Sequence, residues 1–126
     1  MTTTTIIGPV TVGTTPTFAS NITKHTFAAT SGAFNLQANL TAGTQSSTSR
    51  VAIHYAPIMD SVTANAAAVA AVGPGSYIFE AHARDPMLER LFTTDIEGCR
   101  GRYLLVWIEE PLLNAAASLT VKVTEY

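Results

Sequence analysis

The clearest signal in this sequence is a set of short segments in which apolar and polar residues alternate one by one. In residues 34–40 the apolar residues Phe, Leu, Ala and Leu are separated by Asn, Gln and Asn. Successive side chains of a β-strand point to opposite faces of a sheet, so this period predicts a strand with one buried face. The same alternation recurs in residues 51–56, 77–83 and 119–124.

Weaker strands are expected in residues 23–28 and 6–12, and glycine-containing turns separate the segments. This arrangement is typical of all-β domains. We therefore predict an all-β fold in which two sheets pack face to face as a β-sandwich, with jelly-roll or Greek-key connections. Both connection schemes fit this spacing of strands.

Two further segments have helical spacing. Asp85 is a suitable N-cap for a helix with Pro86 at its first position, and the apolar residues at 87, 88, 91 and 92 would share one face. Residues 61–72 fit either a short helix or a strand followed by an alanine-rich connection, and we favour the helix. The sandwich is thus expected to carry one or two short helices.

The segment 103–109 differs from the other strands because both of its faces are apolar. Leu104, Val106 and Ile108 form one face, and a second face is formed by Tyr103, Leu105 and Trp107. A strand of this kind must be covered on both sides. It lies either in the centre of a sheet beneath a helix or loop, or against a partner subunit, and Tyr103, Leu105 and Trp107 are candidate interface residues.

The first 17 residues contain Pro9 and Pro16 and few bulky apolar side chains. Because proline cannot donate a hydrogen bond to a β-ladder, we predict an extended N-terminal arm in residues 1–17, followed by one β-sandwich domain in residues 18–126. Such an arm can add a strand to a neighbouring subunit. Its candidate interface residues are Ile6, Ile7, Val10 and Val12.

Charged residues are few and unevenly distributed. The chain has 7 Lys and Arg, 9 Asp and Glu and a formal net charge of −2, and Lys24 is the only such residue before Arg50. This composition lacks the basic patch that nucleic-acid binding requires. The longest apolar run, residues 66–72, is far shorter than the roughly 20 residues of a membrane-spanning helix, and the first residues lack the pattern of a secretory signal. We expect neither a nucleic-acid nor a membrane partner.

Three histidines and a lone cysteine are the first residues to consider for metal or nucleophilic chemistry. His54, Glu80, His82 and Lys122 fall on the polar sides of their strands, but no metal-ligand spacing connects them. We interpret them as a solvated sheet face. Cys99 has no partner cysteine and no identifiable base, so neither a disulfide nor a cysteine nucleophile is expected.

Carboxylates and arginines offer a second set of candidates. Glu80, Glu109 and Glu110 lie in or beside strands, where paired acids can hydrolyse glycosides. Three acids at such positions also fit ordinary strand ends, and the turn from Gly98 to Arg102 fits a polar turn better than a phosphate cradle. We predict no catalytic residue, no metal and no cofactor, and hence a protein that is not an enzyme.

Trp107 and Tyr103 on one strand face resemble the aromatic platforms of β-sandwich carbohydrate-binding modules. Those modules usually present several aromatic residues around a polar groove, whereas this chain has one Trp. Burial in the fold or in a subunit interface, where Trp and Tyr are enriched, is the preferred interpretation. A carbohydrate- or surface-binding module is retained as the alternative.

The whole pattern suits a protein that packs against other proteins. A Thr- and Ser-rich surface with almost no charge can be buried with little desolvation of ions, and residues 1–49, with Lys24 as their one charged residue, supply such a surface. With the threonine-rich segment 1–17, the Ala- and Gly-rich connection 64–75 and the closing strands 103–109 and 118–125, the chain resembles the small virion proteins of tailed bacteriophages, especially head decoration or cement proteins.

This resemblance implies a non-enzymatic structural protein, commonly a homotrimer, that is made in the host cytoplasm and is located in the virion. It also implies the major capsid protein or another virion protein as partner, at the junctions between capsid subunits. A tail or fibre component is a further alternative. We expect the subunit or capsid contacts to draw mainly on residues 1–49.

Overall fold

The computed structural model describes residues 2–14, 19–28, 34–41, 49–82, 89–94 and 102–126. These residues form β-strands joined by turns, with one short α-helix and one 3₁₀ turn. The elements are β1 (Thr2–Val12), β2 (Ser20–Thr26), β3 (Phe34–Thr41), β4 (Arg50–Ile58), α1 (Ala66–Val72), η1 (Gly73–Gly75), β5 (Tyr77–His82), β6 (Glu89–Thr94), β7 (Tyr103–Leu112) and β8 (Ala117–Glu125).

The strands form two four-stranded antiparallel sheets. One has the order β1-β8-β3-β6 and is called the β1 sheet; the other has the order β2-β7-β4-β5 and is called the β2 sheet. The first strand therefore pairs with the last, the second with the seventh, the third with the sixth and the fourth with the fifth. This is the order of a jelly roll, so the predicted all-β sandwich is confirmed.

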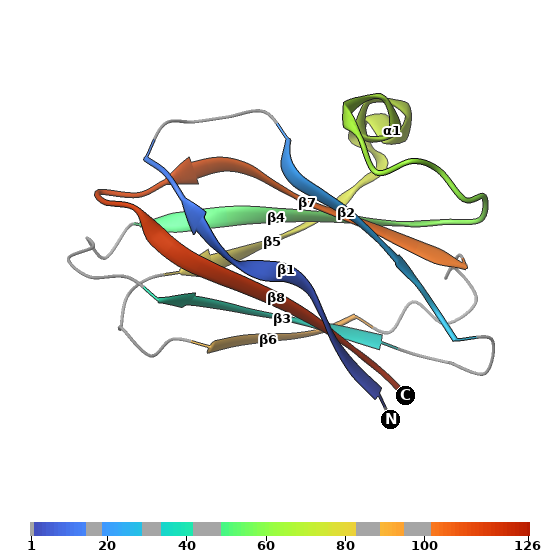
Figure 1. Ribbon diagram of the computed structural model, residues 1–126, viewed down its shortest axis with the longest axis horizontal. Coiled ribbons are helices and arrows are strands. Elements are labelled where there is room, and N and C mark those ends of the chain that lie inside the picture. Colours follow the sequence, from blue (N-terminus) through green and yellow to red (C-terminus); the bar gives the residue numbers. More distant parts are fainter. Residues whose placement is uncertain (1, 15–18, 29–33, 42–48, 83–88, 95–101) are drawn as a thin grey trace.

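The two sheets and the termini are easily followed in Figure 1. The β2 sheet lies in the upper part of that view and the β1 sheet in the lower part, while both termini lie at the same end. Between the sheets the alternating apolar side chains form the core, as their period predicts. Its fully buried members include Leu36, Ala38, Leu40, Val51, Ile53, Leu104, Val106, Ile108, Leu119, Val121 and Val123.

The N-terminal segment is part of this sandwich and is not a separate arm. Residues 2–12 pair along their length with β8 of the same chain. Ile7 and Val12 are buried in the core, and Ile6 and Val10 pack against it. The predicted boundary between an arm and the domain after residue 17 is therefore wrong for residues 2–12. Their backbone pairs with β8, and their apolar side chains are buried in or packed against the core. Residues 1 and 15–17 lie outside the described part.

One predicted helix is confirmed and the other is wrong where the structure describes it. α1 lies within residues 61–72, and the Asn65 side-chain oxygen accepts a hydrogen bond of 3.0 Å from the Ala68 amide at its start. Residues 89–94, expected to continue a helix from Pro86, instead form β6 against β3. Backbone pairing with β3 outweighs the local helical spacing here. Residues 83–88 are outside the described part.

The second apolar face of β7 is covered by the chain itself. Leu105 and Trp107 are 0% and 1% exposed, and they pack with Val69 of α1 and Ala56 of β4 in a second apolar cluster. The prediction that Leu105 and Trp107 form a subunit interface is therefore wrong, because α1 already removes them from solvent. Of the alternatives for this strand, the position beneath a helix is confirmed. No helix of the described residues is long and apolar enough to cross a membrane.

Candidate functional site

The strongest candidate site is a cavity on the outer face of the β2 sheet, where α1 and η1 leave part of that face uncovered. Cross-strand pairing places His54 of β4 between Trp107 of β7 and Ile78 of β5. The helical segment closes one side of the resulting hollow, whose volume is about 480 Å³. The described lining residues are His54, Val69, Ala70, Gly73, Pro74, Ser76, Ile78, Trp107 and Glu109.

The polar groups of this cavity are joined in one cluster around Glu109. The indole Nε1 of Trp107 donates a 2.8 Å hydrogen bond to Oε2 of Glu109, and Nδ1 of His54 lies 3.3 Å from the same oxygen. The hydroxyl of Ser76 lies 3.2 Å from that same Nδ1. The His54 and Trp107 rings are stacked, with centroids 5.5 Å apart and planes 22° from parallel. Each side chain in the cluster therefore holds the next in place.

This geometry suits binding and not nucleophilic catalysis. In a Ser-His-Asp triad the hydroxyl and the carboxylate bond to different ring nitrogens, which lets the imidazole take the hydroxyl proton while the acid orients it. Here Ser76 and Glu109 both approach Nδ1 of His54. The described residues also contain no group of three or more His, Cys, Asp and Glu side chains placed to hold a metal ion.

The sequence placed members of this cluster on strands but did not connect them. The sequence suggests a ring platform at Trp107, an acid at a strand end for Glu109 and a polar sheet face for His54. Trp107 and Glu109 lie two positions apart on one strand, so their shared face is readable from the sequence. The contact of both with His54 depends on the pairing of β4 with β7, for which one sequence offers no signal.

The expected polar face of His54, Glu80, His82 and Lys122 does not form as a unit. Lys122 is on β8, in the other sheet, and Glu80 forms an exposed ion pair with Arg50 at 3.3 Å. The side chains of His82 and Glu110 lie outside the described part, as do Cys99 and the turn at residues 98–101. Glu80 and Glu109 therefore contact different partners, Arg50 and His54, and the described side chains show no contact between the two carboxylates.

Tyr103 differs from the other candidate residues of β7. It is half-buried at the start of the strand, and the ammonium group of Lys24 lies 5.4 Å from the centre of its ring. This is a cation–π distance. Of the candidate interface residues on this strand, Tyr103 is the one that keeps some solvent contact.

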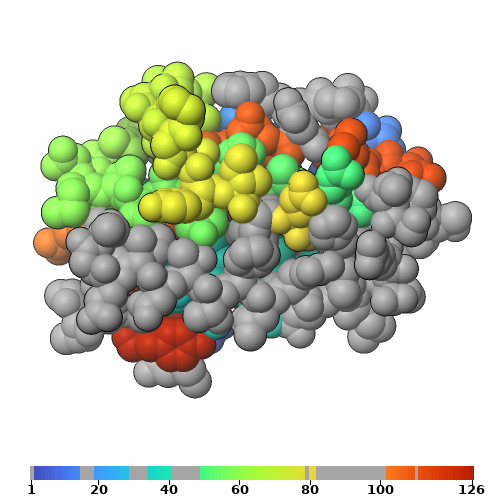
Figure 2. Space-filling model, turned by 180° about the vertical axis from the view of Figure 1, so that it is seen from behind, coloured from blue at the N-terminus to red at the C-terminus, as the bar shows by residue number. Residues whose placement is uncertain are grey.

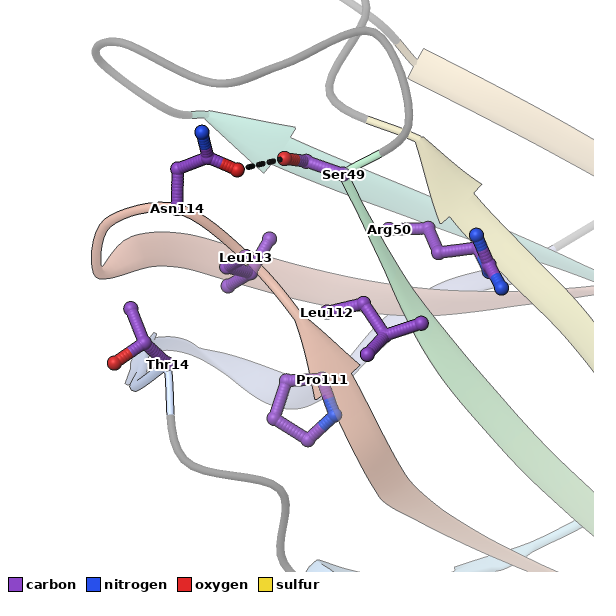
Figure 3. A pocket seen from close by; sticks show the side chains of 7 residues that line it. All are labelled: Thr14, Ser49, Arg50, Pro111, Leu112, Leu113 and Asn114. Carbon is purple, nitrogen blue, oxygen red and sulfur yellow. Dashed lines mark hydrogen bonds between the residues drawn. The ribbon is translucent and has the colours of Figure 1, made fainter.

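A second cavity, of about 300 Å³, lies at the end of the sandwich near the β7–β8 turn. Figure 3 shows Ser49 and Asn114 pointing toward each other, joined by a 3.1 Å hydrogen bond from the Ser49 hydroxyl to the Asn114 side-chain oxygen. Arg50, on the right of the view, pairs with Glu80. The described lining residues include no acid and no histidine, so they supply no general acid or base. They are Thr14, Ser49, Arg50, Pro111, Leu112, Leu113 and Asn114.

The outer face of the β1 sheet is chemically different, and we call it the neutral face. Its described side chains come from β1, β3 and β8 and carry hydroxyls and amides, with Lys122 as the one charged group among them. The hydroxyls of Thr3 and Thr124 are 2.9 Å apart across two strands. A shallow recess of about 120 Å³ lies on this face. The face comprises Thr3, Thr5, Asn35, Gln37, Asn39, Ser118, Thr120, Lys122 and Thr124.

Comparison of the chain with protein-family models, with curated proteins and with solved structures found no match in any of the three. Its function is therefore argued from the surfaces and cavities described above.

Proposed function

We propose that this chain is a non-enzymatic structural protein of a viral particle, a decoration or cement protein that associates with copies of itself and with the major capsid protein. The favoured assembly is a homotrimer, and the favoured location is the virion. The observation that carries this proposal is the neutral face of the β1 sheet. The jelly roll itself is shared by capsid proteins, lectins and cupins, and a fold alone does not select a function.

The neutral face has the chemistry of a surface that can be buried at low cost. Thr3, Thr5 and Asn39 are exposed, and Gln37 and Thr120 are half-buried. Hydroxyls and amides both donate and accept hydrogen bonds, so a facing protein surface can satisfy them. Burying unpaired charges is much more expensive. Among the described side chains of the face, Lys122 is the one that carries a charge.

The position of the described helical elements supports the same choice of surface. α1 and η1 pack over the β2 sheet and do not cover the neutral face of the β1 sheet, where Asn35 and Thr124 are buried and the other residues keep solvent contact. β1 and β3 come from residues 1–49, the segment from which we expect the subunit contacts, and β8 supplies the rest of the described face. Because residues 2–12 are tied into their own sheet, we now propose contacts through the face of β1 and not through strand exchange by a free arm.

The test is the oligomeric state of the full chain and of charge-introducing variants. Size exclusion with light scattering should give a symmetric oligomer. Thr5→Lys and Asn39→Lys should each shift it toward the monomer, because each places an extra cation in the proposed contact. Thr63→Lys is the matched control, since Thr63 is exposed in the segment between β4 and α1, away from the neutral face.

Two results would contradict the proposal. One is a full chain that stays monomeric at high concentration and does not co-sediment with capsids built from the major capsid protein encoded in the same genome. The other is an oligomer that all three variants leave intact. Glycan binding that is lost in Asn39→Lys, in a chain that remains monomeric, would instead support the carbohydrate-binding alternative, because amides and hydroxyls on a sheet face also pair with sugar hydroxyls.

A further inference from the structure

The cavity beside α1 contains two hydrogen-bond acceptors with capacity to spare, on Glu109 and Ser76. Oε2 of Glu109 is engaged by Trp107 and His54, but its Oε1 has no hydrogen bond within the described part of the chain. Ser76 Oγ contacts only His54 among the described residues and retains a second lone pair.

The charge of the cavity has one sign. Glu109 is the only acidic residue in its described lining, and that lining includes no Lys or Arg. Glu109 is also well shielded, since its side chain is 14% exposed. A partly buried carboxylate with no Lys or Arg beside it gains most from a ligand that brings the opposite charge and donates hydrogen bonds.

The rest of the wall is apolar. Trp107 forms part of it, Val69 and Ala70 of α1 and Pro74 of η1 close one side, and Ile78 of β5, 56% exposed, stands at the rim. Figure 2 shows α1, in yellow-green, next to β5, in yellow, on the side of the molecule turned away in Figure 1. A ligand that fills this space must therefore carry an apolar body behind its polar head.

We propose that this cavity binds a primary ammonium group carried on a short aliphatic stem. An ammonium offers several donors to one site, and Glu109 Oε1 and Ser76 Oγ offer acceptors on the same side of His54, since Oε2 of Glu109 and Oγ of Ser76 both approach its Nδ1. A guanidinium fits less well, since its fork prefers both oxygens of a carboxylate, and Oε2 of Glu109 already accepts from Trp107. The volume of about 480 Å³ holds a lysine side chain or a small free alkylamine. This inference does not depend on assembly into a virion.

The test uses the full chain and its single tryptophan as the reporter. Titration with n-butylammonium chloride should change Trp107 fluorescence saturably, with a Kd on the order of millimolar for so small a ligand. n-Butanol, which has the same stem without the charge, should bind at least about tenfold more weakly. n-Butylguanidinium should also bind more weakly than n-butylammonium.

The variant Glu109→Gln removes the charge but retains an oxygen that can accept from Trp107, so it should fold and lose about tenfold or more in n-butylammonium affinity. Glu80→Gln is the control, because it removes one carboxylate near the same sheet face but does not line the cavity. Equal losses in the two variants would mean attraction by overall charge and would overturn the proposal.

If Glu109→Gln does not fold, the binding of the ligands to the parent chain still tests the proposal. No saturable change with n-butylammonium, or equal binding of n-butanol, would overturn it. The source of the ammonium group is settled by Nα-acetyl-lysine methylamide in the same titration. Binding as tight as that of n-butylammonium identifies a lysine side chain of a protein as the occupant, and binding of n-butylammonium alone identifies a free amine. Either result supports the ammonium site.

Discussion

The Nε2 atom of His25 on β2 lies 3.0 Å from Oε2 of Glu125 on β8, so a polar contact joins the two sheets. The other carboxylate oxygen of Glu125 accepts a 2.8 Å hydrogen bond from the backbone amide of Ala28. The side chains of His25 and Glu125 are only 10% and 8% exposed. This contact holds the end of the last strand against the segment that follows β2.

We expect Glu125→Ala to lower the free energy of unfolding by about 2–4 kcal/mol, because it leaves the backbone amide of Ala28 and the largely buried imidazole of His25 without their partner. The control is Glu80→Ala, which breaks the exposed pair with Arg50 and should cost about 0–1 kcal/mol. Urea unfolding of both variants and the parent chain measures the difference. Similar small losses in both variants would show that the contact between the sheets does not contribute to stability.

Gly8 lies where β1 approaches β8 too closely for any side chain. Its φ is +95°, and a Cβ built there would lie 2.3 Å from the carbonyl oxygen of Leu119. We expect Gly8→Ala to destabilise the fold by about 3 kcal/mol or more, from backbone strain and the clash together.

The matched control is Gly13→Ala. Gly13 follows the same strand, and a Cβ there meets no atom within 4 Å. This change should alter stability by no more than about 1 kcal/mol, and in the stabilising direction if it acts mainly on the unfolded chain. Thermal and urea unfolding of the two variants measure the difference. Equal stability of Gly8→Ala and Gly13→Ala would contradict the close approach of β1 to β8.

The sequence predicts clearly the strands that bury one face, whereas strands with an irregular pattern are predicted weakly, as in residues 6–12, or not at all, as in β6. β3 and β4 alternate without interruption, so their period is visible. In β1 the pairing with β8 shifts between Thr5 and Ile7 and again between Ile7 and Val10, which breaks the alternation and makes the segment look like an arm. In β6 the adjacent Leu91 and Phe92 fit a helix face as well as a strand, and only pairing with β3 selects the strand.

The candidate site is harder to predict because its contacts are between distant segments. His54 and Glu109 are far apart in sequence and meet through the register of β4 on β7. Register follows from the packing of all the strands together, and a single sequence does not reveal it. The apolar second face of β7 was nevertheless correctly interpreted as needing a cover, and the 61–72 helix supplies that cover.

The helix that covers this face depends on its N-cap. α1 has only seven residues, too few to be stable alone, and Asn65 satisfies one of its free amides through the bond to Ala68. We expect Asn65→Ala to cost about 1 kcal/mol and to change Trp107 fluorescence, since α1 packs over that ring. Asn65→Asp retains an accepting oxygen, so its free energy of unfolding should differ from that of the parent chain by roughly a few tenths of a kcal/mol. Equal effects of the two changes would contradict the capping role.

Two leucines of β7 test whether the apolar outer face of this strand is covered within one chain. Leu105 is 0% exposed beneath the α1 cluster, whereas Leu112 is 46% exposed at the far end of the strand. Leu105→Ala should lower the free energy of unfolding by about 2–5 kcal/mol, because it leaves a cavity in packed surroundings. Leu112→Ala should change it by about 0.5 kcal/mol or less.

Protein concentration separates a cover within the chain from one supplied by a partner. If α1 buries Leu105, the cost of Leu105→Ala is the same at all protein concentrations, because folding of the covered face is unimolecular. If a second subunit covered this face, the cost would shrink on dilution, since the parent chain would lose its partner there as well. Urea unfolding at two protein concentrations that differ roughly a hundredfold decides between a cover within the chain and a cover from a partner. A dilution-dependent cost would contradict the position of α1 over β7 and return Leu105 and Trp107 to the subunit interface.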